Sequence, residues 1–252
     1  MEFDWRPFLT VAGIALIFVP LELLVPARQR PAFSWRRYTT DILHLGIGGV
    51  MIRLGTIAAV TLIVMQTGRI GHGASLPLWL QVPLVLLMGD FMFWLSHRIT
   101  HAVPFLWQFH RIHHSSKHLD WLAAYRVHPV DQIIDSTLIA LPALLLGFSP
   151  LAVLIYSIVY QWHAILLHSN LRVSLGPLER IIATPQFHHW HHADQPEAYD
   201  RNFGGQLVIW DRMFGTAFVA GSRSPDRFGV SEPPREDFFT HLLAPFVRRT
   251  VR

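Results

Sequence analysis

Long apolar runs are the feature that most constrains how this chain folds. Three of them cover residues 8–24, 42–65 and 78–95, and each is long enough to cross a hydrocarbon core about 30 Å thick as a helix. A fourth region, residues 133–167, is interrupted by Gly147, Ser149 and Pro150 and predicts two helices joined by a tight turn. These two helices either span the membrane or form a hairpin that dips in and returns. The runs predict an all-α polytopic membrane protein with about four transmembrane helices.

The composition agrees with a membrane location. Hydrophobic residues make up 51% of the 252 residues and charged residues only 15%, whereas soluble domains contain about 25% charged residues. The first run lacks a basic segment before it and a cleavage site after it, so we expect an anchor and not a removable signal peptide. No linker, repeat or low-complexity tract divides the sequence. We therefore predict a single integral-membrane domain over residues 1–252.

The arginines predict the orientation. Between the first two runs, residues 27–37 carry Arg28, Arg30, Arg36 and Arg37, and such loops stay cytoplasmic. The second run then exits and the third returns, which makes residues 98–130 cytoplasmic. If residues 133–167 go in and come back, everything after His168 is cytoplasmic as well. The net charge of +4, with arginines beside apolar runs, favours a membrane surface over nucleic acid.

Histidine is the unusual residue of this chain. There are 16 histidines, and all but His44, His72 and His241 lie between His97 and His192. Cysteine is absent, which excludes thiolate metal sites, disulfides and cysteine nucleophiles. The clustered histidines form four short motifs: "HRITH" from His97, "HRIHH" from His110, "WHAILLH" with His163 and His168, and "HHWHH" with His188, His191 and His192. All of them fall at the face predicted to be cytoplasmic, where we expect a helical cap to carry the histidine motifs.

The spacing of these histidines is typical of metal ligands. Positions i, i+3 and i+4 of a helix share one face, so each triplet is expected to meet at one ion. Neutral imidazole suits iron, zinc, copper and nickel. Eight or nine ligands imply two metals, or one metal with a large surplus. Asp90 lies on the same helical stripe as His97 and His101, and we expect its carboxylate to orient a ligand imidazole.

Several other site types lack their motifs. The sequence contains no H-E-x-x-H, E-x-x-H, G-x-S-x-G or P-loop pattern, so neither a zincin protease nor a carboxylate-bridged di-iron bundle is supported. No haem, flavin or nicotinamide motif is present either. Electrons for a redox reaction would then have to come from a separate donor.

The histidine motifs resemble those of the fatty acid hydroxylase and sterol desaturase superfamily. The resemblance extends to "WQFHRIHHSSKHLDWLAAYRVHPVDQ", "LHSNLRVSLGPLERIIATPQFHHWHH" and "NFGGQLVIWDRMFGT" and covers residues 90–216. It implies a catalytic region there and a di-iron centre that activates dioxygen. Zinc lies above ferrous iron in the usual affinity order, so purified protein can carry zinc instead. The implied ligands are His97, His101, His110, His113, His114, His168, His188, His191 and His192. His163 and His128 also fall at histidine positions of the family, and we count His163 as a tenth candidate ligand and His128 as a further one.

The resemblance implies an oxidoreductase that hydroxylates a membrane lipid with O2. A desaturase with the same centre is the nearest alternative, because the histidines do not separate the two reactions. A zinc-dependent hydrolase and a non-catalytic metal-binding or transport protein are rivals from other classes. The electron donor is expected to be a ferredoxin, a cytochrome or a reductase, although one branch of the superfamily uses tetrahydrobiopterin. We expect no ligand role for His44, His72, His118, His189 or His241, and structural turns around Asn202 and Asp211.

Overall fold

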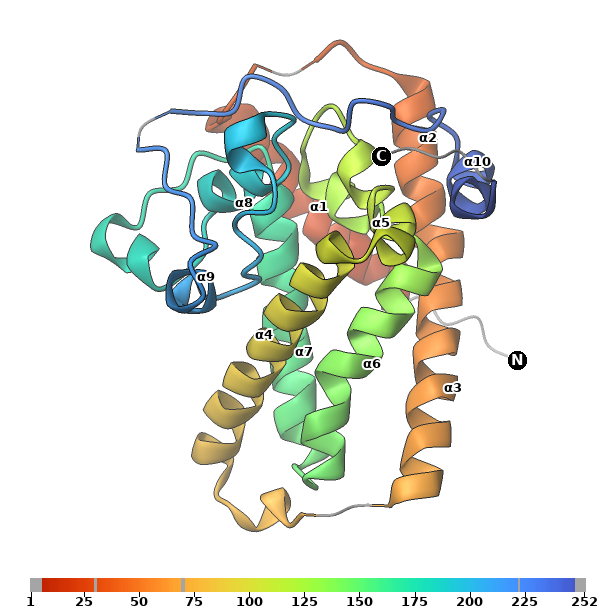
Figure 1. Cartoon of the computed structure of the whole chain (residues 1–252), viewed down its shortest axis with the longest axis vertical. Helices are drawn as coiled ribbons and strands as arrows, with labels where there is room; N and C mark the ends of the chain where they lie inside the picture. The colour runs from red at the N-terminus through yellow and green to blue at the C-terminus, as the bar shows by residue number, and fades with distance from the viewer. Residues whose placement is uncertain (1–5, 30, 69–70, 222, 248–252) are drawn as a thin grey trace.

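The computed structural model describes residues 6–29, 31–68, 71–221 and 223–247, and this part of the chain is helical, with isolated β-bridges but no strand (Figure 1). This confirms the predicted all-α class. The α-helices are α1 (Arg6–Leu24), α2 (Trp35–Leu43), α3 (Gly49–Thr67), α4 (Leu78–Ala102), α5 (Pro104–His110), α6 (Pro129–Leu145), α7 (Pro150–His168), α8 (Pro185–His191), α9 (Ile209–Met213) and α10 (Phe238–Leu243).

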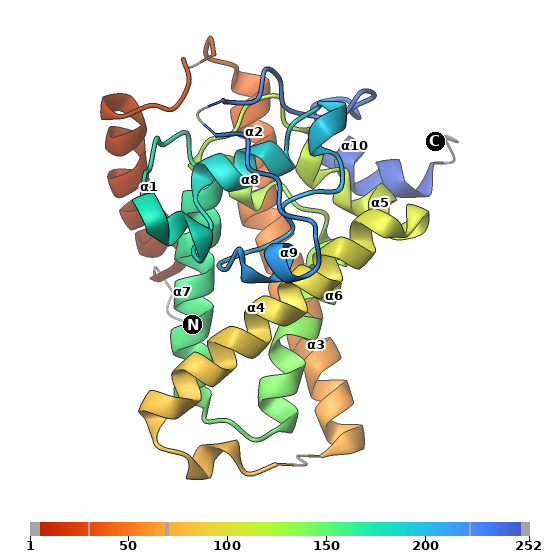
Figure 2. The same ribbon diagram turned by 60° about the vertical axis from the view of Figure 1, so that its left-hand side comes forward.

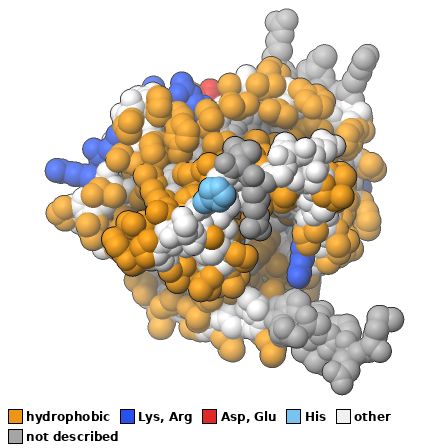
Figure 3. Space-filling model, turned by 90° about the horizontal axis from the view of Figure 1, so that it is seen from below, with side chains coloured by type: hydrophobic (Ala, Val, Ile, Leu, Met, Phe, Trp, Pro, Cys, Tyr) orange, Lys and Arg blue, Asp and Glu red, His pale blue; other side chains and the backbone are white. Residues whose placement is uncertain are grey.

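The long helices α3, α4, α6 and α7 form the body of the molecule (Figure 1). Helix α3 packs on α6, and α4 packs on both α6 and α7. A π-helical segment, His44–Gly48, joins α2 to α3 in one continuous helix. That helix, α4 and α7 are long and apolar enough to cross a membrane. Seen from below, hydrophobic side chains cover most of the described surface (Figure 3), as expected for a surface in contact with lipid.

Prolines and caps determine where the shorter helices begin. The first residue of each of the helices α5 to α8 is a proline, where the missing N–H would have no helical partner anyway. At α7 the hydroxyl of Ser149 accepts a hydrogen bond from the backbone N–H of Ala152 at 3.3 Å. Helices α6 and α7 are thus separate elements, as the break at Gly147, Ser149 and Pro150 predicted.

The turn between α6 and α7 lies against the loop that joins α3 to α4. The backbone N–H groups of Gly73 and Ala74 each donate at 2.8 Å, to the carbonyls of Leu146 and Gly147 respectively. Gly147 has φ +72°, a conformation that favours glycine, and a Cβ there would lie 2.4 Å from the carbonyl oxygen of Gly71. The hairpin therefore reaches the same end of the molecule as the α3–α4 loop and does not stop part-way.

Helix α1 packs against the bundle. It lies beside the upper part of α7 in both views (Figures 1 and 2), where Ile14 and Phe18 pack with Ile165. Its described apolar stretch belongs to the shorter helices and not to the three candidate spans. The buried Glu22 carboxylate accepts hydrogen bonds from the backbone N–H of Trp121 at 2.8 Å and from that of Asn170. The charge that interrupts this apolar run thus fastens α1 to the rest of the fold.

The short helices and turns form a cap at the end of the bundle where α4 and α7 terminate (Figure 1). The arginine-rich loop belongs to the same end. The backbone N–H of Arg28 donates to the side chain of Asn170 at 3.0 Å, and Arg37 pairs with Asp120 at 3.0 Å. The loop and the histidine motifs therefore share one face of the molecule.

Single-cysteine labelling tests which side of the membrane this face occupies. The native chain has no cysteine, so an introduced one reports alone. Cysteines at the exposed positions Ala32, Lys117 and Glu197 are expected to react with an impermeant reagent only from the cytoplasmic side. A cysteine at the exposed Ala74, in the α3–α4 loop, should react only from the other side. Labelling of Ala32 and Lys117 from opposite sides would contradict the shared face.

Candidate metal centre

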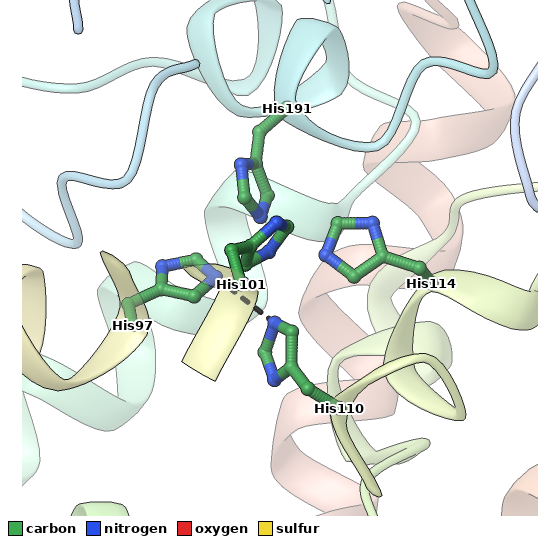
Figure 4. Close-up of side chains that lie close together, drawn as sticks. All are labelled: His97, His101, His110, His114 and His191. Carbon is green, nitrogen blue, oxygen red and sulfur yellow. Dashed lines mark hydrogen bonds between the residues drawn. The ribbon is translucent and has the colours of Figure 1, made fainter. Parts of the chain in front are cut away.

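Nine imidazoles meet where the cap joins the ends of α4 and α7. They form two groups, and within each group one nitrogen per ring lies within 4.8 Å of all the others. Figure 4 shows the rings of the first group converging on one point. The first group contains His97, His101, His110, His114 and His191, and the second contains His113, His168, His188 and His192. Every residue of the two groups except His101 is buried, and His101 is nearly so.

Each histidine triplet is divided between the two groups, so the expectation that a triplet meets at one ion is wrong. Helix α5 ends at His110, and residues His113–Ser115 form a tighter turn, which sends His113 to the second group and His114 to the first. In α8, His191 joins the first group while His188 and His192 join the second. The two groups are therefore neighbours, and the stacked rings of His114 and His192 are 4.4 Å apart.

Hydrogen bonds to the outer ring nitrogen determine the tautomer of several rings. Nδ1 lies 2.9 Å from the Phe203 carbonyl in His97, 3.1 Å from the Arg126 carbonyl in His113, and 2.7 Å from the Ala164 carbonyl in His168. His191 makes the same contact with the Arg201 carbonyl. A carbonyl only accepts, so Nδ1 must carry the proton, and Nε2 of a neutral ring presents a lone pair inward.

These lone pairs face each other at short range. Nε2 of His168 is 3.0 Å from Nε2 of His113 and 3.0 Å from Nε2 of His188. Because the Nδ1 atoms of His168 and His113 hold the protons of those rings, no hydrogen is left to join this pair. Two nitrogens bound at about 2.1 Å to one cation, at right angles, are about 3.0 Å apart. Nε2 of His101, His114 and His191 is buried and has no hydrogen-bond partner among the described residues. The donor set thus fits metal ions.

Burial keeps most of these rings neutral. It lowers the pKa of the His191 imidazole to about 3, and burial together with neighbouring histidines holds the pKa of His114 and His192 well below the usual value. His110 is the exception. Burial acts to lower its pKa, but the charge and the hydrogen bond of Asp131, together with the charge of Asp135, outweigh burial and raise the pKa. Neutral imidazole is the form that binds a metal.

The carboxylate that orients a candidate ligand is Asp131 and not Asp90. Nδ1 of His110 donates to Oδ2 of Asp131 at 2.9 Å, and both side chains are buried. Asp90 instead accepts from the backbone N–H of Gln206 at 2.7 Å and from Nε1 of Trp210 at 2.9 Å. The expectation for Asp90 is therefore corrected: its carboxylate holds the segment after Gly205. Asp131 lies in the block "RVHPVDQ", and the resemblance singled out only the histidine of that block.

Two further candidate histidines lie outside both groups. Nε2 of His163 is hydrogen-bonded to the Ala183 carbonyl at 2.9 Å. His128 uses both ring nitrogens, since Nδ1 accepts from the backbone N–H of Val130 and Nε2 contacts the Leu242 carbonyl. The structure therefore places neither His163 nor His128 with the nine grouped histidines. It also keeps His44, His72, His118, His189 and His241 out of both groups, and it pairs the buried His44 with His241 at 3.0 Å.

The closing segment holds Phe203 against the centre. The Asp211 carboxylate accepts from the backbone N–H groups of Phe203 at 2.9 Å and Gly204 at 2.7 Å. Asn202, at φ +58°, bridges the backbones of Phe187 and Phe218. These are the structural turns that the sequence predicted. Their effect on the site is indirect, because they place the Phe203 carbonyl on which His97 depends.

A cavity of about 430 Å³ leads from the histidines into the bundle. Its wall includes rings of both groups and, further along, Val85 of α4, Ile139 of α6 and Val153 of α7. Helices α6 and α7 each pack closely on α4, and the cavity lies between them. Its volume and apolar lining suit a hydrocarbon chain.

Replacing Asp131 tests its role in orienting His110. Asp131→Asn keeps an acceptor for Nδ1–H but removes the charge, and we expect metal affinity to fall about 10- to 100-fold. Competition with a chelator measures this. Asp226→Asn, at an exposed position, is the matched control and should leave affinity unchanged. Equal affinity in both variants would show that Asp131 does not support the site.

Comparison with known families and proteins gives matches over this same region. A family model described as fatty acid hydroxylase matches residues 82–216. The ornithine lipid hydroxylase of Rhizobium tropici is 31% identical over 252 residues, which cover 95% of this chain and 74% of that protein. The alkylglycerol monooxygenase of Homo sapiens is 38% identical over 162 residues and that of Danio rerio 38% identical over 134 residues.

The coverage differs between these relatives. The matches to the human and zebrafish enzymes cover 62% and 53% of this chain but only 35% and 29% of those proteins. This chain therefore spans about a third of the alkylglycerol monooxygenases that it resembles. No solved structure matches the chain.

Proposed function

The chain belongs to the fatty acid hydroxylase family, and from that premise we propose that it is an O2-dependent lipid hydroxylase with a di-iron centre. The observation that carries this proposal is the pair of adjacent histidine groups at the end of an apolar cavity. The relatives named as a lipid hydroxylase and as monooxygenases support the reaction class.

The nine grouped histidines would hold the metal ions, one ion in each group. Iron ions, when bound, would supply the redox chemistry that activates dioxygen towards an unactivated C–H bond. Hydroxylation consumes the C–H bond, dioxygen, two electrons and two protons, and it yields an alcohol and water. Hydrogen bonds from Nδ1 to carbonyls keep the Nε2 lone pairs of His97, His113 and His191 directed at the ions.

The remaining residues of the site would position the lipid and keep out water. The cavity continues the apolar interior of the bundle up to the histidines, so a hydrocarbon chain can reach the centre without leaving an apolar environment. Exclusion of water protects a reactive centre from side reactions. The shared face of the histidines and the arginine-rich loop supports a cytoplasmic location for the centre.

The electrons would come from a separate redox partner. Ferredoxins, cytochromes and reductases all remain compatible with the sequence. The single-domain organisation over residues 1–252, with catalytic residues between 90 and 216, is likewise part of this proposal.

Two alternatives use the same site differently. A desaturase would remove two hydrogens from the lipid and form a double bond. A zinc hydrolase would activate water and need neither dioxygen nor electrons. Transport is disfavoured, because the candidate ligands lie at the ends of α4 and α7 and in the short cap segments, and not midway through the spans.

Lipid extracts compared by mass spectrometry, with and without expression of the chain, test the proposal. We expect a lipid that gains one oxygen atom in the expressing cells. Loss of two hydrogens would identify the desaturase instead. The His191→Ala variant is the control and should give the lipid profile of cells without the protein. An unchanged profile under aerobic expression of iron-loaded protein would contradict both oxidative reactions.

A further inference from the structure

The cavity carries polar groups that the metal centre does not use. Most of its wall is apolar, but Gln206 and Tyr156 also line it. Gln206 is 4% and Tyr156 5% exposed. Neither side-chain amide atom of Gln206 has a hydrogen-bond partner among the described residues, and the same holds for the Tyr156 hydroxyl. A buried polar group without a partner is energetically unfavourable, so these two side chains are expected to hydrogen-bond to a ligand.

The backbone of Gln206 is fixed on both sides. Its N–H donates to Asp90 at 2.7 Å, and its carbonyl accepts from the N–H of Ala183 at 2.9 Å. Gly205, just before it, packs against Phe93 so closely that a Cβ there would lie 2.7 Å from the ring. The Gln206 amide therefore projects from a rigid support. It lies three residues after Phe203, whose carbonyl orients His97.

Tyr156 contacts the same turn of α4. A Cβ at Gly89 would lie 2.6 Å from the Tyr156 hydroxyl oxygen, so the ring depends on the glycine for its place. Asp90, the next residue of α4, holds the backbone of Gln206. The positions of both side chains therefore depend on α4, since Tyr156 contacts Gly89 and the backbone of Gln206 is held by Asp90.

We propose that Gln206 and Tyr156 form a polar anchor for one neutral oxygen-bearing group, an ester, amide or hydroxyl, within the otherwise apolar chain of the substrate. The amide of Gln206 can donate and accept, and the Tyr156 hydroxyl can do the same, which matches a carbonyl or a hydroxyl. Among the described residues no lysine or arginine lines the cavity, whereas Asp131 and Asp135 do. Away from the metal centre, a carboxylate or phosphate would therefore meet no cationic side chain of the described residues.

This inference rests on the proposed function and deepens it. An anchor at a fixed place in the wall sets which carbon of the chain lies beside the histidines. Gln206 is therefore a positioning and specificity residue, and the apolar wall beyond it accepts the rest of the chain.

Competition binding tests the anchor. Protein in phosphatidylcholine nanodiscs is labelled with an alkyl diazirine probe, and methyl palmitate, octadecane and palmitate compete at equal mole fraction. Methyl palmitate and octadecane have the same chain length. We expect methyl palmitate to compete about three- to tenfold better than octadecane, as one or two net hydrogen bonds imply, and palmitate to compete no better than octadecane.

Substitutions assign the preference to the two side chains. Gln206→Leu should abolish the preference for methyl palmitate while octadecane competes as before, and Tyr156→Phe should reduce it. Gln66→Leu, on the exposed face of α3, is the matched control. Metal content is measured in every variant to confirm folding, and Tyr156→Phe remains informative if Gln206→Leu does not fold.

The outcomes separate this inference from the proposed function. Equal competition by the ester and the hydrocarbon in the native protein, or a preference unchanged in both variants, would overturn the anchor. Strongest competition by palmitate in metal-free protein, where no metal ion can bind the carboxylate, would overturn its neutrality. If the anchor holds but iron-loaded protein oxidises no lipid, only the proposed reaction fails. If lipid is oxidised, Gln206→Leu should spread the oxygen over several carbons, and retention of a single position would contradict the anchor.

Discussion

Protein freed of metal, reconstituted anaerobically with ferrous iron and then given air and an electron donor is expected to yield oxidised lipid, and zinc-reconstituted protein none. Zinc has no accessible redox change, so it cannot reduce dioxygen. Both ions accept imidazole, and the same nine histidines should bind either one. The expected contrast is product above background in one sample and background in the other, measured by lipid mass spectrometry and oxygen uptake.

Thermal unfolding is the control in this experiment, because it shows whether both metal forms are folded. Thermal unfolding should be similar for the two metal forms, because both ions cross-link the same helices. Lipid turnover by the zinc form without oxygen would contradict the oxygenase and favour the hydrolytic alternative. The distinction matters because zinc lies above ferrous iron in the usual affinity order. Protein isolated from zinc-rich medium can therefore carry a metal that is not the catalytic one.

Much of the fold was predictable from the apolar runs. The run at 42–65 lies within the continuous helix 35–67, and the break at Gly147 and Pro150 separates α6 from α7. Periodicity and turn residues determine such features locally. The place of α1 was not predictable in this way, because it depends on the contacts of Glu22 with the backbone of Trp121 and Asn170, residues far along the chain.

The sequence predicted which histidines form the candidate site better than it predicted how they are arranged. The nine histidines implied by the resemblance are the nine that the structure brings together. The division of each triplet was not predictable from helical spacing, since α5 ends at His110 and the next residues turn. The partners of Nδ1 are mostly backbone carbonyls, such as that of Phe203, and every residue type has one. Sequence patterns cannot single them out.

The division into two groups predicts different losses of metal from single substitutions. His113→Ala leaves three ligands in the second group, and we expect the metal affinity of that group to fall, so that up to about one ion per chain is lost. His191→Ala leaves four ligands in the first group, so much of that metal should remain bound. Activity should fall at least about 100-fold in both variants, since even the partners of ligands are worth 10- to 100-fold.

Metal content by elemental analysis and lipid oxidation, measured on the same samples, test this. His72→Ala, at an exposed position away from both groups, is the control and should keep full metal content and activity. His241 is unsuitable as a control, because it is buried against His44 and its loss would leave that ring without its partner. If His113→Ala and His191→Ala lose the same amount of metal, the two groups do not bind independently. Loss of metal in His72→Ala as well would mean that unfolding, and not ligation, was being measured.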